Sequence, residues 1–279
     1  MPNDFNQQII DQFRANQGQV GPPFEGARLL LLTTTGARTG ARHTTPLGYL
    51  PDGGSGRVLV IASAGGAPAN PAWYHNVRAN PRVTVEDGVF TYEADAEILD
   101  GDERDQIFAR AVETDPGWAE YQAKAGRTIP VIGLTPTGPG APNASRAGDG
   151  LKLIHDAFRR ELALIRKEVA ESGPGLGTQL RINCLTLCQG LEHHHLIEDA
   201  HMFPHLDGQH AELGPALARL RAEHKTVKRL LDELQQLLSA ESADRVTVLA
   251  EVERLTTEVE AHLDYEEEQL VPILNGITP

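Results

Sequence analysis

The sequence has few of the features that mark secreted or membrane-embedded proteins. Only two of its 279 residues are cysteines, Cys184 and Cys188, and no run of 18 or more apolar residues occurs. Their spacing of four places both thiols on one helix face, a poor arrangement for a disulfide, so we expect two buried core residues in a reducing compartment. The first residues also lack the basic and apolar regions of a signal peptide. We therefore expect a cytoplasmic protein without a membrane span.

Positive charge is also scarce. Lysine and arginine number 25 against 39 aspartates and glutamates, which gives a net charge of −14. The deficit extends over both halves, because residues 1–150 carry 12 basic and 17 acidic side chains and residues 151–279 carry 13 and 22. Since no basic block occurs, nucleic acid is not expected as a partner. A local basic groove in the first half could still bind a polyanionic small molecule.

A stretch rich in proline, glycine and small polar residues, 135–149, divides the chain. Such a composition is typical of a linker without regular structure. The pattern differs on its two sides, with short apolar runs and glycine-rich turns before it and long helical periodicities after it. We therefore predict two domains, residues 1–134 and 150–279.

The first domain contains six short runs with the composition of β-strands, at 28–34, 44–49, 57–62, 82–86, 92–98 and 129–134. Pro-Asp-Gly-Gly at 51–54 and Glu-Asp-Gly at 86–88 have the composition of hairpin turns. Helical patterns at 4–16 and 102–113 flank the strands. These elements predict an α+β domain built around an antiparallel sheet or barrel.

The second domain has the periodicity of four long helices, at about 150–171, 179–203, 215–239 and 244–270. Glycine, proline and serine separate them, and Pro272 is expected to end the last one. Four helices of this length, joined by short connections, predict an all-α up-down-up-down four-helix bundle.

Histidine is concentrated in this second domain, which contains nine of the eleven after residue 151. His194 and Glu198 are four residues apart on the second predicted helix, and His262 and Glu266 repeat that spacing on the fourth. Helix geometry places the two members of each pair on one face, one turn apart. His155 lies early in the first predicted helix.

Bundle topology brings these positions to one level, because alternate helix starts and ends meet there. His224 lies early in the third helix and therefore joins them. Four imidazoles and two carboxylates suit iron, and carboxylates can bridge two metal ions. The predicted ligands are His155, His194, Glu198, His224, His262 and Glu266. Which of His193, His194, His195 and His201 points inward stays open, and manganese or zinc would accept the same ligand types.

Together with Phe203-Pro204-x-Leu206 and Leu270-x-Pro272, these segments resemble the hemerythrin-like domain family over about 151–275. The resemblance implies two non-haem iron ions, bound by the six ligands above, that meet dioxygen, peroxide or nitric oxide. Oxygen-carrying members place a second histidine four residues after the third-helix histidine, where this chain has Lys228. The last helix also pairs histidine with glutamate at four residues rather than aspartate at five, with Glu267 as the offset alternative. A redox, sensing or peroxide-consuming role is therefore expected over reversible oxygen carriage.

The first domain has three segments beside its strands that suit an anionic or flat ligand. Arg38 and Thr39 lie in a glycine-rich turn whose backbone N–H and guanidinium groups suit an anion. A strand ends in the Gly-Gly turn of residues 62–68, where a flat ligand could approach the backbone. Trp73-Tyr74-His75 stands where a helix begins, and a helix N-terminus favours phosphate.

With Pro116–Gln122 and Ile129–Leu134, these segments resemble the deazaflavin (F420)-dependent nitroreductase family over about residues 5–134. The resemblance implies a split β-barrel that binds coenzyme F420 and passes hydride to quinones, nitroaromatics or similar acceptors. FMN is the alternative cofactor, because split barrels hold both. The implied cofactor contacts are Arg38, Thr39, Arg42, His43, Thr44, Thr45, Pro46, Leu47, Ile61, Ala62, Ser63, Ala64, Ala72, Trp73, Tyr74, His75, Asn76 and Tyr121.

The same resemblance implies three catalytic residues. Tyr121 would act as a proton donor or position the substrate through its hydroxyl, and Ser63 would hydrogen-bond the reacting region. Trp118 stands near the substrate where the family has a tyrosine. An arginine common in the family is His43 here, with Arg42 one position earlier, which alters the contact to the phosphate or glutamate tail.

The sequence therefore predicts an F420H2-dependent reductase of a quinone- or nitroaromatic-type acceptor, fused to a di-iron domain that handles or senses O2, peroxide or NO. The alternative is a non-enzymatic di-iron sensor or iron-binding protein whose first domain only binds a cofactor. Barrels of this family often self-associate, so a homo-oligomer is compatible with the resemblance.

Overall fold

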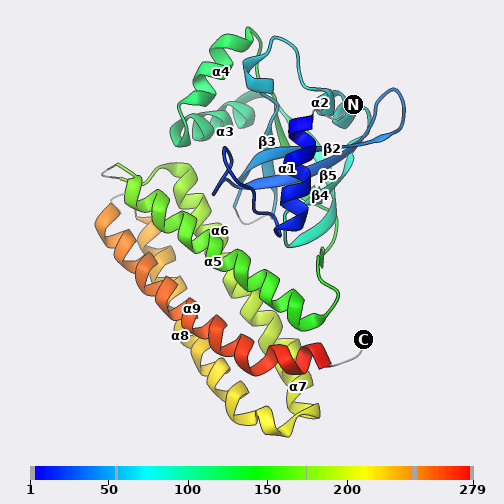
Figure 1. The fold of residues 1–279 in the computed structure, drawn as a ribbon. Coiled ribbons are helices and arrows are strands. Elements are labelled where there is room, and N and C mark those ends of the chain that lie inside the picture. The colour runs from blue at the N-terminus through cyan, green and yellow to red at the C-terminus, as the bar shows by residue number, and fades with distance from the viewer. Residues whose placement is uncertain (1–3, 54–55, 174, 241–243, 277–279) are drawn as a thin grey trace. The chain divides into compact units, whose positions relative to one another are not determined.

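The computed structural model describes residues 4–53, 56–173, 175–240 and 244–276. The chain forms two compact units, the first running to Asn143 and the second beginning at Ala144 (Figure 1). Among the described residues, no helix combines the length and the apolar composition needed to cross a membrane.

The first unit is a closed antiparallel barrel. Its six main strands follow the order β4-β1-β2-β3-β6-β5, and β4 also pairs with β5. The strands are β1 (Leu29–Thr35), β2 (Arg42–Pro51), β3 (Val58–Ile61), β4 (Arg82–Glu86), β5 (Phe90–Leu99) and β6 (Val131–Pro136). All six were predicted from the sequence, and the barrel confirms the predicted fold class.

The barrel core explains the apolar run at the start of β1. Side chains alternate along a strand, so Leu30 and Leu32 point into the barrel and Leu29 and Leu31 point outward. The outward pair is covered by the apolar face of α1 (Asp4–Ala15). A strand buried on both faces needs a continuous apolar run, as Leu29–Leu32 has.

Helical segments complete the first unit: η1 (Ala64–Gly66), α2 (Ala72–Ala79), α3 (Gly101–Thr114) and α4 (Gly117–Ala125). The sequence predicted α1 and α3 but not α4. At nine residues α4 is too short for a clear helical period, although Pro116 precedes it and Gly126, at a left-handed φ of 61°, ends it.

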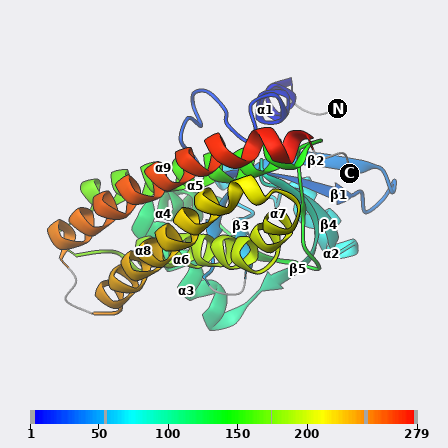
Figure 2. The ribbon, with the colours of Figure 1, turned by 90° about the horizontal axis from the view of Figure 1, so that it is seen from below.

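The second unit is a bundle of four long helices that run side by side (Figure 2). They are α5 (Ala147–Glu171), α6 (Thr178–Ile197), α8 (Gly214–Ser239) and α9 (Arg245–Gly276). Two apolar clusters fill its interior, one around Leu162, Cys188 and Leu263 and the other around Phe203, Leu217 and Leu270. Both cysteines lie in the first cluster, fully buried and without a disulfide.

Two helix ends differ from the prediction. The second helix was expected to end near residue 203, but α6 passes into a π-helical turn (Glu198–Met202) and then α7 (Phe203–Gln209). Pro204 lies in the first turn of α7, where no N–H partner is required, so it does not stop the chain. Pro272 likewise lies inside α9. Leu270 and Leu274, both in the second apolar cluster, hold the turn around it in place.

The stretch 135–149, predicted as a linker without regular structure, is largely ordered. It includes the last residues of β6, a short strand β7 (Ala141–Pro142) that pairs with β5, and the start of α5. Gly140 makes this pairing feasible, because a Cβ there would lie 2.9 Å from the Cβ of Phe90. Local pairing with an existing strand overrides the weak propensity of this segment.

Candidate functional site

Seven histidine and glutamate side chains gather at one level of the bundle, between the two apolar clusters. They come from α5, α6, the π-helical turn, α8 and α9 and form two groups. Within each group the potential ligand atoms all lie within 4.8 Å of one another. One group is His195, His224 and His262, and the other is His155, His194, Glu198 and Glu266. None of these side chains is more than 10% exposed.

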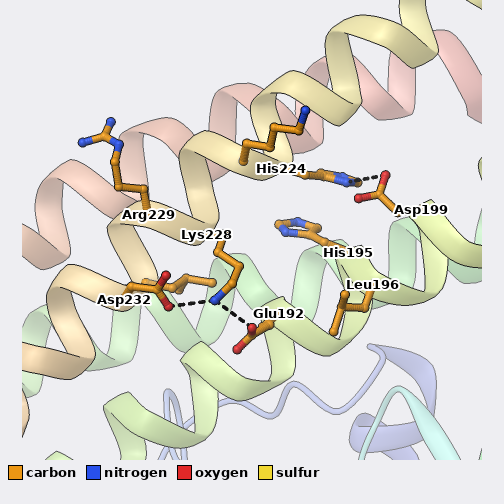
Figure 3. Close-up of a pocket in the computed structure, with 10 residues that line it drawn as sticks. Glu192, His195, Leu196, Asp199, His224, Lys228, Arg229 and Asp232 are labelled. Carbon is orange, nitrogen blue, oxygen red and sulfur yellow. Dashed lines mark hydrogen bonds and ion pairs between the residues drawn. The ribbon is translucent and has the colours of Figure 1, made fainter.

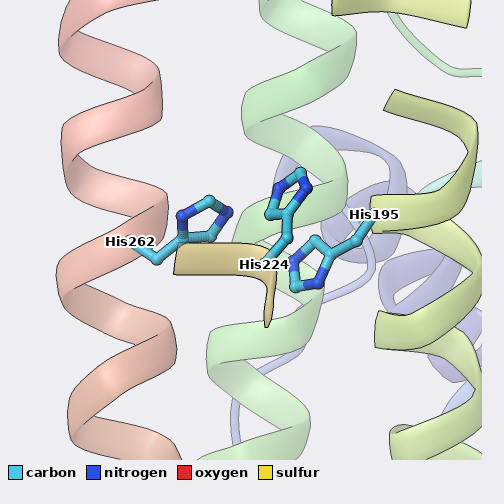
Figure 4. A group of neighbouring side chains, drawn as sticks. All are labelled: His195, His224 and His262. Carbon is cyan, nitrogen blue, oxygen red and sulfur yellow. The ribbon is translucent and has the colours of Figure 1, made fainter. Parts of the chain in front are cut away.

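The first group consists of three imidazoles from three helices (Figure 4). The rings of His195 and His224 stack, with centroids 4.2 Å apart and planes 14° apart. The His262 ring stands edge-on to both, at 5.1 Å from His195 and 4.8 Å from His224. All three are buried, so the group is closed to bulk water on most sides.

The second group combines two imidazoles and two carboxylates. His155 Nε2 lies 3.2 Å from His194 Nε2 and 3.5 Å from Glu266 Oε2, and His194 Nε2 lies 3.0 Å from Glu198 Oε1. Two donor atoms that bind one metal ion at right angles are roughly 3 Å apart, given metal–nitrogen bonds of about 2.1 Å. These separations therefore suit a shared metal ion.

The hydrogen bonds of the cluster are incomplete in a way that fits metal ions. Eight buried atoms of the cluster have no hydrogen-bond partner: Nε2 of His195, His224 and His262, Nδ1 of His224, and both carboxylate oxygens of Glu198 and Glu266. Some lie close to an imidazole nitrogen, as Glu198 Oε1 does, without hydrogen-bond geometry. Buried polar atoms left unpaired cost free energy, so they indicate a missing partner. The donor set fits two cations of intermediate hardness.

A second ring of acidic residues orients the histidines. Nδ1 of His155 lies 3.0 Å from Glu267, Nδ1 of His262 lies 3.0 Å from Glu223, and Nδ1 of His224 lies 3.1 Å from Asp199. A carboxylate at Nδ1 keeps the proton there and leaves the Nε2 lone pair facing the centre. Arg159 in turn donates to Glu267 at 2.7 Å.

Burial sets the charge of the cluster without metal. It lowers the pKa of His194 and His195 well below the ordinary histidine value and that of His262 to about 4. Burial also raises the pKa of Glu198 well above its ordinary range and that of Glu266 to about 8. At neutral pH the metal-free site therefore holds neutral imidazoles and protonated carboxyls, and metal binding displaces protons.

In the first unit, β2 changes its neighbour half-way along. Arg42 to Gly48 pair with β1, whereas β2 pairs with β3 only from Tyr49 onward. Within the described part of the chain, residues 42–48 thus have a strand partner on one side only. We call their other side the β2 edge. Such a half-open strand can receive the backbone of a segment or the edge of a flat ligand.

Side chains along β2 divide between the two faces of the sheet. Arg42 and Thr44 lie on the outer face, where Arg42 donates to Thr84 of β4 and Thr44 bonds Thr33 of β1. The remaining residues expected there to contact the cofactor are His43, Thr45, Pro46 and Leu47, all in β2. The structure therefore does not bring Arg42 to the face on which α2 lies, because α2 bonds the buried Thr34 of β1.

Helix α2 contributes mainly to packing. Trp73 and Tyr74 are buried in the barrel core. Asn76 is also buried and bonds the Thr34 hydroxyl and the backbone N–H of Ala37, so it joins α2 to the turn that carries the exposed Arg38 and Thr39. Ala72 and His75 are exposed on the same helix. The turn and α2 are thus neighbours, as the predicted site requires.

The segment after β3 lies against α4. Ile61 and Ala62 are buried, whereas Ser63 is half-buried and Ala64 exposed. A Cβ built on Gly66 would lie 3.2 Å from the backbone oxygen of Tyr121. Tyr121 is 40% exposed, and its ring stands edge-on to that of Trp118 at 6.0 Å. The three residues with predicted catalytic roles are therefore on neighbouring segments.

Comparison with known proteins assigns both units. The family model of the F420H(2)-dependent quinone reductases matches residues 6–136, and that of the hemerythrin HHE cation binding domain matches residues 147–274. An F420H(2)-dependent quinone reductase of Mycobacterium tuberculosis is 36% identical over 127 residues, which cover 44% of this chain and 84% of that protein. The chain belongs to the F420H(2)-dependent quinone reductase family.

Two further proteins are similar to the first unit of this F420H(2)-dependent quinone reductase family member. A putative F420H(2)-dependent quinone reductase of Mycobacterium tuberculosis is 34% identical over 107 residues, 38% of this chain and 88% of that protein. A solved F420-H2 dependent reductase is 42% identical and covers 38% of this chain and 93% of its own, with a TM-score of 0.35. The recognised fusion of a reductase domain with a hemerythrin-like domain is confirmed.

In the hemerythrin HHE domain of this family member, the structure brings together all six predicted ligands and adds His195. His193 and His201 are exposed, and so is His205. The sequence left open whether His195 points inward, because its neighbours His193 and His194 have the same side chain. Its position three residues before Glu198, with His194 four before, places Glu198 between the two histidines on the helix surface, and this spacing was the available signal.

Two supporting residues of this F420H(2)-dependent quinone reductase family member were also missed. Glu267, considered as a ligand, instead bonds His155 Nδ1. Arg127 donates to the backbone oxygens of Ala62, Ser63, Ala67 and Ala69 and so holds the segment after β3. Neither role follows from local spacing, because both partners are distant in sequence.

Proposed function

We propose that the first unit binds reduced coenzyme F420 and reduces a quinone- or nitroaromatic-type acceptor. The observation that carries this proposal is the β2 edge, which lies beside the cofactor segments in a chain of the F420H(2)-dependent quinone reductase family. When bound, the reduced deazaflavin supplies a hydride, and a quinone that takes this hydride and one proton becomes a quinol.

The chain's own residues would bind and orient the two molecules. The exposed guanidinium of Arg38 and the Thr39 hydroxyl would hold the anionic tail, and the backbone of residues 61–64 would face the ring system. Asn76 positions the turn that carries Arg38. Tyr121, exposed on α4, would supply the proton or position the acceptor through its hydroxyl.

We propose further that the second unit holds two non-haem iron ions. His195, His224 and His262 would bind one ion, His155 and His194 the other, and Glu198 and Glu266 would bridge them, since all four carboxylate oxygens lack partners. The proposed ligands at this centre are O2, peroxide or NO. Neutral imidazoles with Nδ1 held by carboxylates suit such a resident metal pair.

The test is anaerobic mixing of the iron-loaded, oxidised protein with reduced F420 and a soluble quinone, followed in the deazaflavin band and the ferric charge-transfer bands. Consumption of F420H2 that depends on the quinone is expected, and a Tyr121→Phe variant should turn over more slowly. Absence of turnover with quinones and nitroaromatics would contradict the reductase proposal. If reduced FMN supports turnover and reduced F420 does not, FMN replaces F420 as the proposed cofactor.

A second candidate is a non-enzymatic di-iron sensor whose first unit only binds its cofactor. The observation that favours it is a cavity of about 360 Å³ beside the metal histidines of the second unit. The same mixing experiment separates the two. Bleaching of the ferric bands as F420H2 is consumed without quinone indicates coupled centres. A His194→Ala variant should abolish that coupling.

A further inference from the structure

A cavity of about 360 Å³ lies between α6 and α8, outside the metal cluster (Figure 3). Two of its lining residues, His195 and His224, belong to the three-histidine group. Both have a buried Nε2 without a hydrogen-bond partner. The cavity therefore lies beside the three-histidine group and not beside the other group, since His155 and His194 do not line it.

One side chain spans this cavity. Lys228 of α8 reaches across to Glu192 of α6, with its Nζ 2.9 Å from Glu192 Oε1, and also contacts Asp232 at 2.8 Å (Figure 3). The Lys228 side chain is 51% exposed. Ion pairs this exposed contribute little net stability, so this contact breaks and re-forms readily. It can therefore close the space between two helices and still open on thermal motion.

The cavity wall is mixed in character. Leu196 and Leu231 supply apolar surface, and Leu196 is 58% exposed. Lys225, Lys228 and Arg229 supply three positive charges to the same wall, and Glu192, Asp199 and Asp232 supply three negative charges. Apolar surface admits a small neutral molecule, and the balanced charges leave no net repulsion of a small anion. Both classes include ligands of iron.

We propose that this cavity is the entry route for small neutral or anionic ligands to the three-histidine metal position, and that Lys228 closes it. The inference rests on the proposed di-iron site but not on the reductase activity. The three imidazoles at this position come from α6, α8 and α9. Lys228 belongs to neither group of ligand atoms and lines the cavity beside them.

Azide is the probe, because its ferric complex absorbs in the visible range. The full-length, iron-loaded ferric protein is mixed with azide in a stopped-flow instrument, and association and dissociation rates are measured for each variant. Lys228→Ala and Glu192→Gln both break the ion pair and should each raise both rates about fivefold, with an unchanged Kd, in line with the worth of an exposed ion pair. Leu196→Trp should lower both rates by a similar factor.

The charge of azide sharpens the test. Lys228→Ala removes a positive charge, so electrostatic attraction alone predicts slower association, whereas loss of closure predicts faster association. The matched control is Arg254→Ala, which breaks the ion pair with Glu233 between α8 and α9, away from the cavity. Its rates should equal those of the parent protein. Iron content of every variant is measured independently.

The outcomes separate the two proposals. If the parent protein forms no ferric–azide band at saturating azide, the di-iron proposal fails and the entry route fails with it. If the band forms and Lys228→Ala, Glu192→Gln and Leu196→Trp all match Arg254→Ala, the di-iron site stands and the entry route is overturned. A change in Kd without matched changes in both rates overturns it too, because a route alters rates and leaves affinity unchanged.

Discussion

The two units differ in how many buried polar atoms at their proposed sites find hydrogen-bond partners within the chain. In the first unit the buried Asn76, near the proposed cofactor site, bonds Thr34 and Ala37, and only Asn70 Oδ1 and Arg127 Nη1 of the described residues around that site are buried without a partner. In the second unit the buried atoms of Glu198 and Glu266 have none. A cofactor that comes and goes must leave behind a surface that is stable alone. A resident metal pair is part of the fold and completes it.

The comparison yields a physical criterion for the two kinds of site. Unpaired buried polar atoms signal a permanent occupant, because the free protein would otherwise bear their cost throughout its life. Half-open backbone and satisfied side chains, as along the β2 edge, signal a transient one. Four experiments test this distinction between a permanent and a transient occupant.

Metal removal should have the largest effect and should act on the second unit alone. Iron at a thousandfold excess over its Kd stabilises the folded unit by about 4 kcal/mol, which corresponds to a rise in Tm on the order of 15 °C. Differential scanning calorimetry of the iron-loaded and chelated protein measures it. The transition of the first unit should stay in place, and His262→Ala should abolish the shift. A shift of both transitions by the same amount would contradict the prediction that iron is part of the second unit alone.

Loss of Arg127 should affect the first unit next most strongly. Arg127→Ala removes the charged donor to four backbone oxygens of residues 62–69, at a cost of about 2–3 kcal/mol. Affinity for F420, measured by fluorescence titration, should fall by about tenfold or more, while iron content stays unchanged. The control is Lys124→Ala, which removes one exposed contact to Gly65. Equal F420 affinities of the two variants would contradict the positioning role of Arg127.

Variants of Glu267 and Glu266 distinguish a residue that orients a ligand from a residue that is a ligand. Glu267→Gln weakens the hold on His155 Nδ1 and should lower iron affinity by about tenfold to a hundredfold while two ions still bind. Glu266→Gln removes one of the two carboxylates proposed as ligands and should reduce the number of ions bound. Metal analysis after dialysis against graded chelator distinguishes them, with the exposed Glu268→Gln as control. A lower iron count in Glu267→Gln would make Glu267 a ligand after all.

The smallest effect is on pH dependence. Because the pKa of Glu266 in the metal-free protein is raised to about 8, this carboxyl must lose its proton on binding iron at lower pH. Glu198, whose pKa is also raised, must lose its proton as well. Iron affinity should therefore rise by at least about tenfold per pH unit between pH 6 and 8. The histidines add no proton, since their pKa values are lowered. Calorimetry in buffers of different ionisation enthalpy counts the protons, and pH-independent uptake would contradict the prediction.

Sequence reasoning succeeded where local pattern decides structure. Strand-like composition and turn residues located all six barrel strands. Two His-x-x-x-Glu spacings and the helix order predicted that the six proposed ligands lie at one level, and the structure brings them together. It could not choose among His193, His194 and His195, because neighbouring side chains on a helix point in directions that depend on where the helix sits in the bundle. The structure shows that two of the three point inward.

Long-range partners were beyond its reach. Arg127 and Glu267 act on residues far away in sequence, and no periodicity records such contacts. Helix α4 is too short to show a period, and the segment 135–149 takes structure from β5 rather than from its own composition. Pro204 and Pro272 were expected to stop helices, but a first-turn position and apolar packing around the turn make them tolerable.

The π-helical turn from Glu198 to Met202 has a consequence for how this helix can change over generations. A π turn contains one residue more than the α turn it replaces, as the bond from Phe203 N–H to the Glu198 oxygen shows. It has the form of a one-residue insertion absorbed within a helix. Deleting one residue there would return the turn to α geometry and leave the helix after it in register, so Phe203 would keep its stacking on the His224 ring, now at 5.3 Å. The chain can therefore change its length by one residue at this point without moving the apolar side chain that closes the histidine layer.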